Sequence, residues 1–269
     1  MSIILDNMID DLVSCELCTG IGKQLFQIAT VLNYAKRNKK CPVFKNKLND
    51  LVSDSLDVLS DDMLKKRVFR KHEERIENAY NEIPRYNGDI ILHGYFQAFQ
   101  NISKNTLKRM QELIYSDEFY MYQAYGEYNK IKTFFQSEDD DDYVAIHVRR
   151  NGSFEHGQLD LQYYRSAYDI MTESGKKQRY CVVFSDDIEW CKQNFKISDQ
   201  MYFVDIRHAC VEFILMSFIK NNIIANSCYS WWATFISNYA DKVVIAPKQW
   251  YCKRSDRWDD LYPPGWIII

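Results

Sequence analysis

Residues 143–150 read YVAIHVRR, an apolar run that ends in two adjacent arginines. Two further runs in the second half of the chain have the same form, YCVVFSDD at residues 180–187 and NIIANS at residues 222–227. Each is followed by a helical pattern, and KVVIAP at residues 242–247 supplies a fourth expected strand. Short apolar runs that alternate with helices are typical of a doubly wound parallel sheet, so this half is predicted to have an α/β fold.

The polar residues that end these runs are predicted to lie together. Parallel strands of such a sheet point the same way, and ligands bind at the carboxyl ends of the strands. The side chains expected at this edge are His147, Arg149, Arg150, Ser185, Asp186, Asp187, Asn226 and Ser227. This convergence predicts a binding site and is the main functional signal in the sequence.

The two arginines indicate an anion. A guanidinium group stays protonated and presents a rigid fork of donors that matches phosphate oxygens. A structural salt bridge is the alternative for Arg149 or Arg150 alone, whereas two arginines at one strand end favour an anion site. A helix that begins at Ser227 or Ser230 would add exposed N–H groups and the positive end of its dipole. Capping alone explains these serines, but together with the arginines they favour a phosphate site.

Asp186 and Asp187 have two interpretations. Either one of them caps the helix that follows the strand, or one carboxylate accepts the two N–H groups on the edge of a guanine base. His147 nearby either contacts that base or is a buried histidine with its hydrogen bonds satisfied.

The first half of the chain predicts a second α/β unit. It begins with an expected strand at residues 12–17 and a glycine turn at residues 18–24, followed by a helix with apolar residues at helical spacing. CPVF at residues 41–44 is expected to form a short strand, and DIILHGYFQAFQN at residues 89–101 a further strand that ends in a polar and aromatic cluster. A helical stretch at residues 102–135 completes this half.

The glycine turn CTGIGKQ is not a standard cofactor motif. Leu25 stands where a dinucleotide fingerprint has its third glycine. Leu17 replaces the first glycine of a P-loop, and Gln24 replaces its Ser or Thr. A tight turn remains, which brings backbone close to a ligand.

The acidic run SEDDDD at residues 137–142 separates the halves. Like charges repel and extend a chain, so a solvated linker is expected here and not a metal site. With 269 residues, the chain exceeds the usual size of one hydrophobic core. Two domains are therefore predicted, residues 1–140 and 141–269.

The composition is that of a globular protein, with 46% apolar and 26% charged residues. A net charge of -3 without a basic stripe argues against a nucleic-acid partner. The 8 cysteines are scattered, which favours reduced thiols and no metal site. No apolar segment reaches about 18 residues, so no integral membrane segment and a cytoplasmic location are expected. Trp231 and Trp232 are expected in the core, because the helical pattern continues through Phe235.

The ordered motifs of the chain resemble those of a known enzyme family. GIGKQLFQIA at residues 20–29 resembles the opening GGLGNQxFQxA of the α-1,2-fucosyltransferases, family 11 of the glycosyltransferases, with Lys23 in place of the Asn. The family's further motifs resemble HGYFQ, IHVRR, LDLQYYRSA, FSDDIEWCKQNF, EFILMS and IIANSCYSWWATFIS with KVVIAPKQW, in the same order. The resemblance covers about residues 12–250, which is nearly the whole chain.

The resemblance implies a GT-B fold, in which two Rossmann-like domains face an interdomain cleft. The second domain would bind the sugar nucleotide, and the first would lie on the acceptor side. The resemblance also implies GDP-fucose as the donor, a glycan as the acceptor, inversion at the anomeric carbon, and no metal or other cofactor.

Roles for individual residues follow from the matching positions. Arg149 would hold the diphosphate of the donor, with Arg150 beside it. His147 and either Asp186 or Asp187 would face guanosine. The other donor-side positions are Asn226, Ser227 and Ser230 in the second half and Gly20, Gly22 and Gln24 in the first, and the acceptor-side positions are His93, Tyr95 and Gln97.

The sequence departs from the family where an acid is expected. The family follows the two arginines with Gly-Asp, whereas this chain has Asn151 and Gly152. An asparagine cannot take the proton of an acceptor hydroxyl. Glu155 is the first candidate for the base, with His156 and Asp160 as alternatives, and a loose reaction with late proton loss also stays open.

The sequence thus predicts an inverting α-1,2-fucosyltransferase that acts on a galactose-type sugar. Two alternatives remain: a related transferase that uses another GDP-deoxysugar, and a non-catalytic protein that binds a sugar nucleotide or a glycan. The missing acid motivates the second of these.

Overall fold

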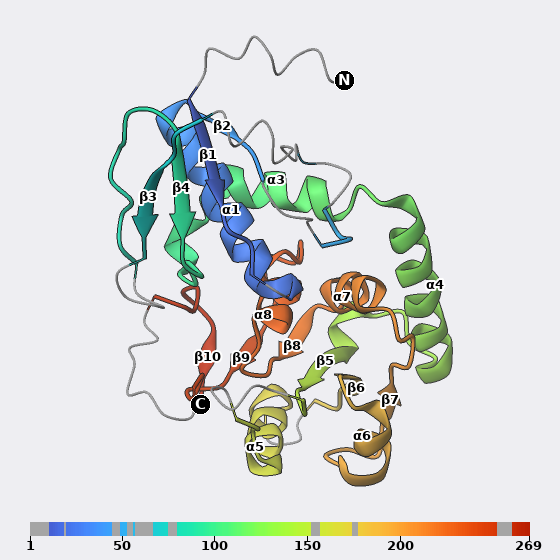
Figure 1. Cartoon of the computed structure of the whole chain (residues 1–269). Coiled ribbons are helices and arrows are strands. Elements are labelled where there is room, and N and C mark those ends of the chain that lie inside the picture. The colour runs from blue at the N-terminus through green and yellow to red at the C-terminus, as the bar shows by residue number, and fades with distance from the viewer. Residues whose placement is uncertain are drawn as a thin grey trace. The chain divides into compact units, whose positions relative to one another are not determined.

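The computed structural model describes residues 11–18, 20–44, 49–52, 56, 67–74, 80–151, 157–173, 177–251 and 260–269. Contacts within the chain divide it into two compact units. The first unit is Met1–Leu113 with Asp259–Tyr262, and the second is Ile114–Trp258 with Pro263–Ile269. Each unit is built on a parallel sheet (Figure 1).

The first unit contains a four-stranded parallel sheet in the order β2-β1-β4-β3. Its strands are β1 (Leu12–Cys15), β2 (Cys41–Pro42), β3 (Arg70–Glu73) and β4 (Ile90–His93). Its helices are α1 (Ile21–Asn38), the 3-10 helix η3 (Phe99–Asn101) and α3 (Lys104–Ile114), whose last residue belongs to the second unit. The order of β1, α1 and β2 confirms the predicted strand, turn, helix and strand.

Helix α1 forms because its apolar residues fall on one face. Leu25, Phe26 and Ile28 are fully buried, and burial of a side chain of this size contributes about 1.5–3 kcal/mol. The helix begins after Gly20, whose φ of 92° lies in the left-handed region that glycine adopts readily. The predicted glycine turn into a helix is therefore confirmed.

Asp260 belongs to the first unit, although it follows almost all of the second unit in the sequence. Its carbonyl oxygen accepts a hydrogen bond from the N–H of Phe99 at 2.9 Å. Its carboxylate accepts one from the N–H of Tyr80 at 2.9 Å and one from the side chain of Gln100 at 2.5 Å. Two segments 160 residues apart are thereby fastened together.

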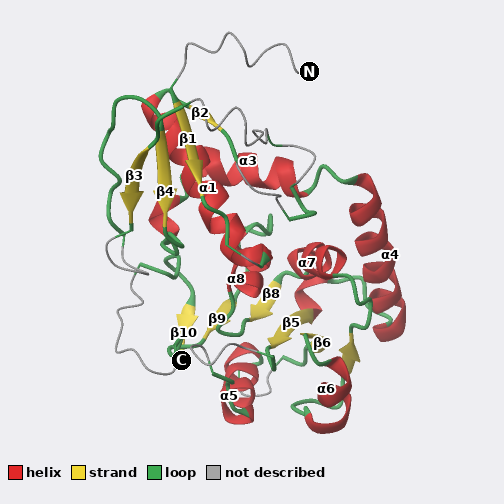
Figure 2. Cartoon of the chain, in the orientation of Figure 1, coloured by secondary structure: helices red, strands yellow, loops and turns green. Residues whose placement is uncertain are grey.

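The second unit contains a six-stranded parallel sheet in the order β10-β9-β8-β5-β6-β7. Its strands are β5 (Tyr143–Val148), β6 (Tyr180–Ser185), β7 (Met201–Phe203), β8 (Asn221–Ile223), β9 (Val244–Ala246) and β10 (Ile267–Ile268). Its helices are α4 (Glu118–Phe135), η4 (Asp140–Asp142), α5 (Leu161–Met171), α6 (Ile188–Asn194), α7 (Ala209–Phe218) and α8 (Cys228–Phe235), and Figure 2 shows how they alternate with the strands. The predicted parallel α/β sheet is confirmed, and β7 and β10 are short edge strands that the sequence analysis did not anticipate.

The core of the second unit is centred on β5, every residue of which is buried. Val144 and Ile146 of this strand join Tyr164 of α5 in one hydrophobic cluster. Trp231 and Trp232 of α8 are also fully buried, which confirms their predicted place in the core.

Helix α4 packs within the second unit, whereas the sequence analysis placed it before a boundary at residue 140. Phe135 stacks on Tyr180 of β6, with ring centroids 4.4 Å apart. The rings of Tyr128 and Phe218 of α7 lie 6.2 Å apart. Because these aromatic contacts attach α4 to the sheet and to α7, the compact units divide before α4 begins.

The acidic run at residues 137–142 is not a solvated linker, which corrects the expectation from the sequence. Asp140 accepts hydrogen bonds from the hydroxyls of Tyr128 and Tyr239, both at 2.7 Å. Asp141 pairs with Lys177, Arg179 and Lys220, and the first two of these cations hold the pKa of its carboxyl well below the usual range. The fold places basic residues just before β6 and β8, beside the start of β5, so the aspartates are neutralised instead of repelling one another.

Candidate ligand site at the edge of the second sheet

The sheet of the second unit brings the predicted polar residues to one edge. Val148 at the end of β5 is paired with Ser185 at the end of β6, and Ile146 is paired with Ile223 of β8. Because all three strands run the same way, the residues that follow them leave the sheet on the same side. Arg149, Asp186 and the segment that leads to Ser227 therefore lie next to one another.

Arg149 reaches toward the amino end of α8. Its Nη1 donates a hydrogen bond to the carbonyl oxygen of Asn226 at 3.1 Å. Ser227 is at the N-cap position of α8, but its side chain makes no capping hydrogen bond. Ser230 is fully buried, and its hydroxyl donates a hydrogen bond to the carbonyl of Ser227 at 3.2 Å. This hydroxyl proton is therefore used within the helix. A guanidinium group beside the positive end of a helix dipole favours an anion.

Arg150 is held differently from Arg149. Its guanidinium carbon lies 3.6 Å from the centre of the Trp190 ring, a cation–π contact. Its Nη1 donates to the side chain of Gln158 at 2.7 Å, and the Gln158 amide donates back to the Arg150 carbonyl at 2.6 Å. Arg150 is thus fixed by protein groups, whereas Arg149 contacts a carbonyl oxygen at the start of a helix.

Asp186 organises the turn that carries both arginines. Its carboxylate accepts hydrogen bonds from the backbone N–H groups of Arg150 at 2.7 Å and of Asn151 at 2.9 Å. The side-chain amide of Asn151 donates to the Asp186 carbonyl at 3.1 Å. A carboxylate at position 151 could not donate this bond, which gives the asparagine after the arginines a physical reason.

Asp187 is a helix cap. Its side chain accepts a hydrogen bond from the N–H of Trp190 at 3.1 Å, and its own N–H donates to the Ser185 hydroxyl at 3.0 Å. Capping is one of the two interpretations drawn from the sequence for this pair of aspartates. A contact of either carboxylate with guanine stays a prediction.

His147 is a neutral, buried imidazole at this edge. Its exposed fraction is 7%, and burial lowers its pKa to about 4, although the negative charge of Asp186 acts to raise that pKa. Within the described part of the chain, its Nδ1 has no hydrogen-bond partner. Its ring lies 5.6 Å from that of Tyr229. A neutral imidazole with an unused nitrogen can donate to or accept from a ligand.

Glu212 is a titratable group that the site prediction missed. It lies in the first turn of α7, accepts a hydrogen bond from the N–H of Arg207 at 2.9 Å, and interacts electrostatically with Tyr229. Burial raises the pKa of its carboxyl to about 7. The signal was present in the sequence, because an acid inside the apolar run EFILMS needs a structural or functional reason.

In the first unit, Gln24 fastens two loops. Its amide nitrogen donates to the carbonyl of Cys18 at 2.9 Å, and its amide oxygen accepts from the N–H and the side chain of Asn49, both at 2.9 Å. Gly20 precedes α1, and Gly22 is buried in its first turn. These contacts shape the turn after β1, and a contact with a donor stays a prediction.

The three predicted acceptor-side residues differ in accessibility. His93 is partly exposed, with its Nδ1 3.4 Å from a carboxylate oxygen of Glu16. The ring of Tyr95 is also partly exposed and lies 4.6 Å from the Nζ of Lys23. Gln97 is fully buried, so it supports this region from inside.

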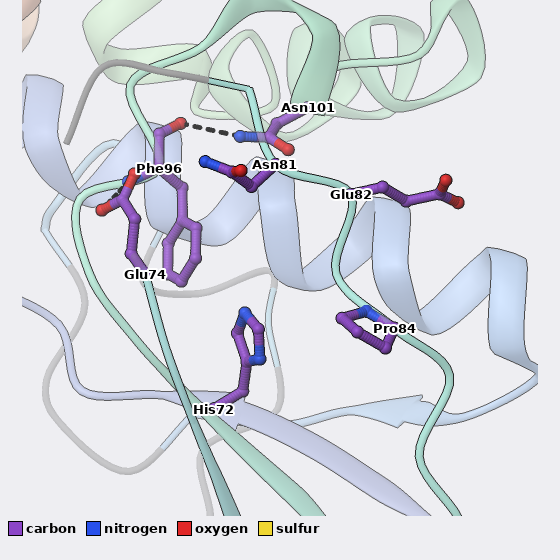
Figure 3. A pocket seen from close by; sticks show the side chains of 7 residues that line it. All are labelled: His72, Glu74, Asn81, Glu82, Pro84, Phe96 and Asn101. Carbon is purple, nitrogen blue, oxygen red and sulfur yellow. Dashed lines mark hydrogen bonds between the residues drawn. The ribbon is translucent and has the colours of Figure 1, made fainter. Parts of the chain in front are cut away.

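A cavity of about 120 Å³ lies behind the turn that follows β4 (Figure 3). Its walls are formed by His72, Glu74, Asn81, Glu82, Pro84, Phe96 and Asn101. The Glu74 carboxylate accepts the N–H groups of Tyr95 at 2.7 Å and of Phe96 at 3.0 Å, and Asn101 donates to the Phe96 carbonyl at 3.2 Å. The cavity is well below the roughly 300–1,000 Å³ of sites for drug-sized ligands, so it belongs to the support of this turn.

Glu155, His156 and Gly152 lie outside the described residues. Asp160, the remaining candidate for a base, is the N-cap of α5 and accepts a hydrogen bond from the N–H of Tyr163 at 2.8 Å. Among the described residues, no group of three or more His, Cys, Asp or Glu side chains could hold a metal ion. A search of the same residues finds no helix with the length and apolar character needed to cross a membrane.

The chain belongs to glycosyl transferase family 11, whose family model matches residues 8–269. The family predicted from the ordered motifs is therefore confirmed. The O-antigen biosynthesis glycosyltransferase WbnK of Escherichia coli is 34% identical over 136 residues, which cover 47% of this chain and 44% of that protein. An alpha-1,2-colitosyltransferase of the same species is 34% identical over 137 residues, 47% of each. The match thus spans less than half the length of either curated relative.

Solved structures of two fucosyltransferase crystals resemble this chain in fold. The fucosyltransferase NodZ from Bradyrhizobium has a TM-score of 0.55 at 12% identity, over 85% of this chain and 94% of that chain. A structure of NodZ alpha-1,6-fucosyltransferase soaked with GDP-fucose has a TM-score of 0.55 at 13% identity, over 84% and 92%. With the two parallel sheets, this likeness confirms the predicted α/β fold of GT-B type.

Proposed function

We propose that the chain is an inverting glycosyltransferase that moves fucose, or a closely related deoxysugar, from a GDP-sugar to a hydroxyl of a glycan. The observation that carries this proposal is the position of Arg149 at the carbonyl of Asn226, beside the amino end of α8. Membership of glycosyl transferase family 11 supports the reaction class. The colitosyltransferase among the relatives keeps a second deoxysugar beside fucose as a candidate donor.

The proposed chemistry requires a diphosphate to leave. The bond between the anomeric carbon and the phosphate oxygen breaks while the acceptor oxygen attacks from the opposite face, so the configuration inverts. Negative charge grows on the leaving group, and donors already aimed at it stabilise the transition state. Arg149 and the first N–H groups of α8 are the donors proposed here, in place of a divalent cation and without any cofactor.

His147 is proposed to contact the guanine base. Its ring is neutral near pH 7 because burial lowers its pKa to about 4, and its buried Nδ1 has no hydrogen-bond partner in the described part of the chain. Asp186 is proposed as a positioning residue instead of a base contact, because its carboxylate already accepts two backbone N–H groups. Its role is to hold the turn from which Arg149 extends.

Transfer to O-2 of a galactose-type sugar is the specific activity that we propose. One relative is an alpha-1,2-colitosyltransferase, which supports the linkage. The acceptor-side places of His93 and Tyr95 stay predictions. A non-catalytic protein that binds a sugar nucleotide is the second candidate, favoured by Asn151 and Gly152 where the family has an acid.

A donor screen tests the proposal. The purified chain is incubated with GDP-fucose, GDP-colitose, GDP-mannose and UDP-galactose, each with a galactoside acceptor and with EDTA, and release of nucleoside diphosphate is followed. Release of GDP from a GDP-deoxysugar in the presence of EDTA is expected. Release from UDP-galactose alone, or strict dependence on a divalent cation, would contradict the proposal, and binding of GDP without turnover would favour the non-catalytic candidate.

A further inference from the structure

A cavity of about 700 Å³ lies in the second unit, between α5 and the end of β9. The residues around it are Gln158, Leu159, Asp160, Gln162, Tyr163, Ser166, Pro247, Lys248, Gln249, Tyr251 and Ile269. The volume falls within the roughly 300–1,000 Å³ of small-molecule sites. The proposed binding of the donor does not use this cavity.

Two contacts join the wall of this cavity to the arginine site. Gln158 exchanges hydrogen bonds with Arg150, from the guanidinium at 2.7 Å and to the carbonyl at 2.6 Å. The hydroxyl of Tyr163 donates at 2.7 Å to the carbonyl of Ile224, two residues before the Asn226 that contacts Arg149. The cavity is therefore adjacent to the place where the donor's diphosphate is proposed to bind.

The walls of the cavity have the chemistry that a neutral sugar requires. Sugar hydroxyls donate and accept hydrogen bonds, and the amides of Gln162 and Gln249 and the hydroxyl of Ser166 do both. Tyr163 and Tyr251 add flat rings with apolar faces, against which a sugar ring can pack. Lys248 and Asp160 contribute one charge of each sign, so the described lining has no excess charge for an ionic ligand.

One carboxylate oxygen of Asp160 accepts a hydrogen bond within the chain, and the other can accept one from a ligand. Its Oδ1 accepts the N–H of Tyr163 at 2.8 Å as the cap of α5, while no hydrogen bond to the other oxygen is found within the described ranges. The residue is exposed, and it is the one acidic side chain among the described residues around the cavity. A carboxylate in this position can accept a proton from a bound hydroxyl.

We infer that this cavity receives the neutral sugar that carries the attacking hydroxyl, and that Asp160 takes the proton of that hydroxyl. The inference rests on the proposed function, because it names the acceptor side of the same reaction. In the step, the acceptor oxygen forms a bond to the anomeric carbon, its proton passes to the free oxygen of Asp160, and the bond to the leaving GDP breaks. The proton is later released to solvent.

Asp160→Asn tests the role of the carboxylate. An asparagine can still cap α5, because its amide oxygen accepts the N–H of Tyr163, but it cannot take a proton. We expect kcat to fall about 100-fold or more, while KM for the donor and the melting temperature stay unchanged. A kcat within threefold of the wild type would show that Asp160 is only a helix cap.

Ser166→Phe tests the cavity by filling it, with Arg165→Ala as the matched control on the same helix. Arg165 is exposed and does not line the cavity. We expect KM for the acceptor to rise at least tenfold in Ser166→Phe and to stay unchanged in the control, while slow hydrolysis of GDP-fucose in the absence of acceptor persists. Gln249 is exposed, so Gln249→Ala should leave the fold intact, and it should also raise the KM for the acceptor.

The outcomes separate this inference from the proposed function. If the wild-type chain hydrolyses GDP-fucose but the acceptor KM is the same in Ser166→Phe, Gln249→Ala and the wild type, the cavity assignment is wrong and the proposed function stands. If the wild-type chain neither binds nor hydrolyses any GDP-sugar, both are overturned.

Discussion

Asp186 and Asn151 bind each other in both directions. The Asp186 carboxylate accepts the Asn151 N–H at 2.9 Å, and the Asn151 side chain donates to the Asp186 carbonyl at 3.1 Å. The two arginines lie directly before Asn151, and the Asp186 carboxylate also accepts the backbone N–H of Arg150 at 2.7 Å. Asn151 is therefore a structural partner of the turn that follows the arginines.

Asn151→Asp should destabilise this turn. The new carboxylate cannot donate to the Asp186 carbonyl, and it adds a like charge beside the Asp186 carboxylate. A lost hydrogen bond costs about 1 kcal/mol, which lowers the melting temperature of a domain of this size by roughly 2–4 °C. Thermal denaturation measures the effect, and Asn151→Ala, which removes the bond without adding charge, should lose less. Equal losses in the two variants would argue against the charge repulsion.

Arg149 and Arg150 should respond differently to substitution. Arg149→Ala is expected to slow GDP release from the donor by about 100-fold, because a donor aimed at the leaving group is lost. Arg149→Lys keeps the charge without the planar fork and should lose less. Arg150→Ala should have a smaller effect on rate and a larger one on melting temperature, since its guanidinium packs on Trp190. Trp190→Ala is the matched variant and should behave like Arg150→Ala.

A full rate in Arg149→Ala would remove the basis of the phosphate assignment. Rates are measured at saturating donor, so that a change in affinity is not read as a change in chemistry. Titration with GDP measures the affinity separately. We expect Arg149→Ala to weaken GDP binding as well.

Glu212 should make the chain less stable as the pH rises. Its pKa is about 7 in the folded chain and near 4.5 when unfolded, so the folded chain holds the proton more tightly. The stabilisation is complete below about pH 4.5 and is lost as the pH rises through about 7, with a slope of at most about 1.4 kcal/mol per pH unit. Glu212→Gln should remove this part of the pH dependence in denaturant unfolding. A curve parallel to that of the wild type would contradict the raised pKa.

His147 should make the chain less stable as the pH falls. Burial lowers its pKa from about 6.5 to about 4, so the unfolded chain binds the proton more tightly than the folded chain. Stability should therefore fall as the pH drops from about 6.5 to 4. His147→Gln, which cannot take up a proton, should flatten this limb when its unfolding free energy is compared with that of the wild type. If the limb stays unchanged, the acid sensitivity comes from other groups.

The sequence predicted the elements that long or regular patterns specify. The apolar runs that became β5, β6, β8 and β9 end in polar residues, and parallel pairing then brings those residues to one edge. The helix α1 was predictable for the same reason, because its apolar spacing and the glycine before it agree. The edge strands β7 and β10 span three and two residues, which is too short for a periodic signal.

What the sequence did not reveal depended on tertiary contacts. The run at residues 137–142 looks repulsive in isolation, and only the fold places Lys177, Arg179 and Lys220 beside Asp141. The attachment of α4 to the second unit depends on aromatic partners that follow it in the sequence. The difference between Arg149 and Arg150 depends on Trp190, which packs on the guanidinium of Arg150. The spacing of residues in the sequence does not predict this contact.

The contacts of Asp260 have a consequence for the order in which the chain can fold during synthesis. The ribosome makes Tyr80, Phe99 and Gln100 early, but the residue that binds all three emerges about 160 residues later. Until then the N–H groups of Tyr80 and Phe99 and the side-chain amide of Gln100 must form hydrogen bonds with water or with a chaperone. Most of the second unit is synthesised during this time. The first unit can thus complete these contacts only after most of the second unit has been synthesised.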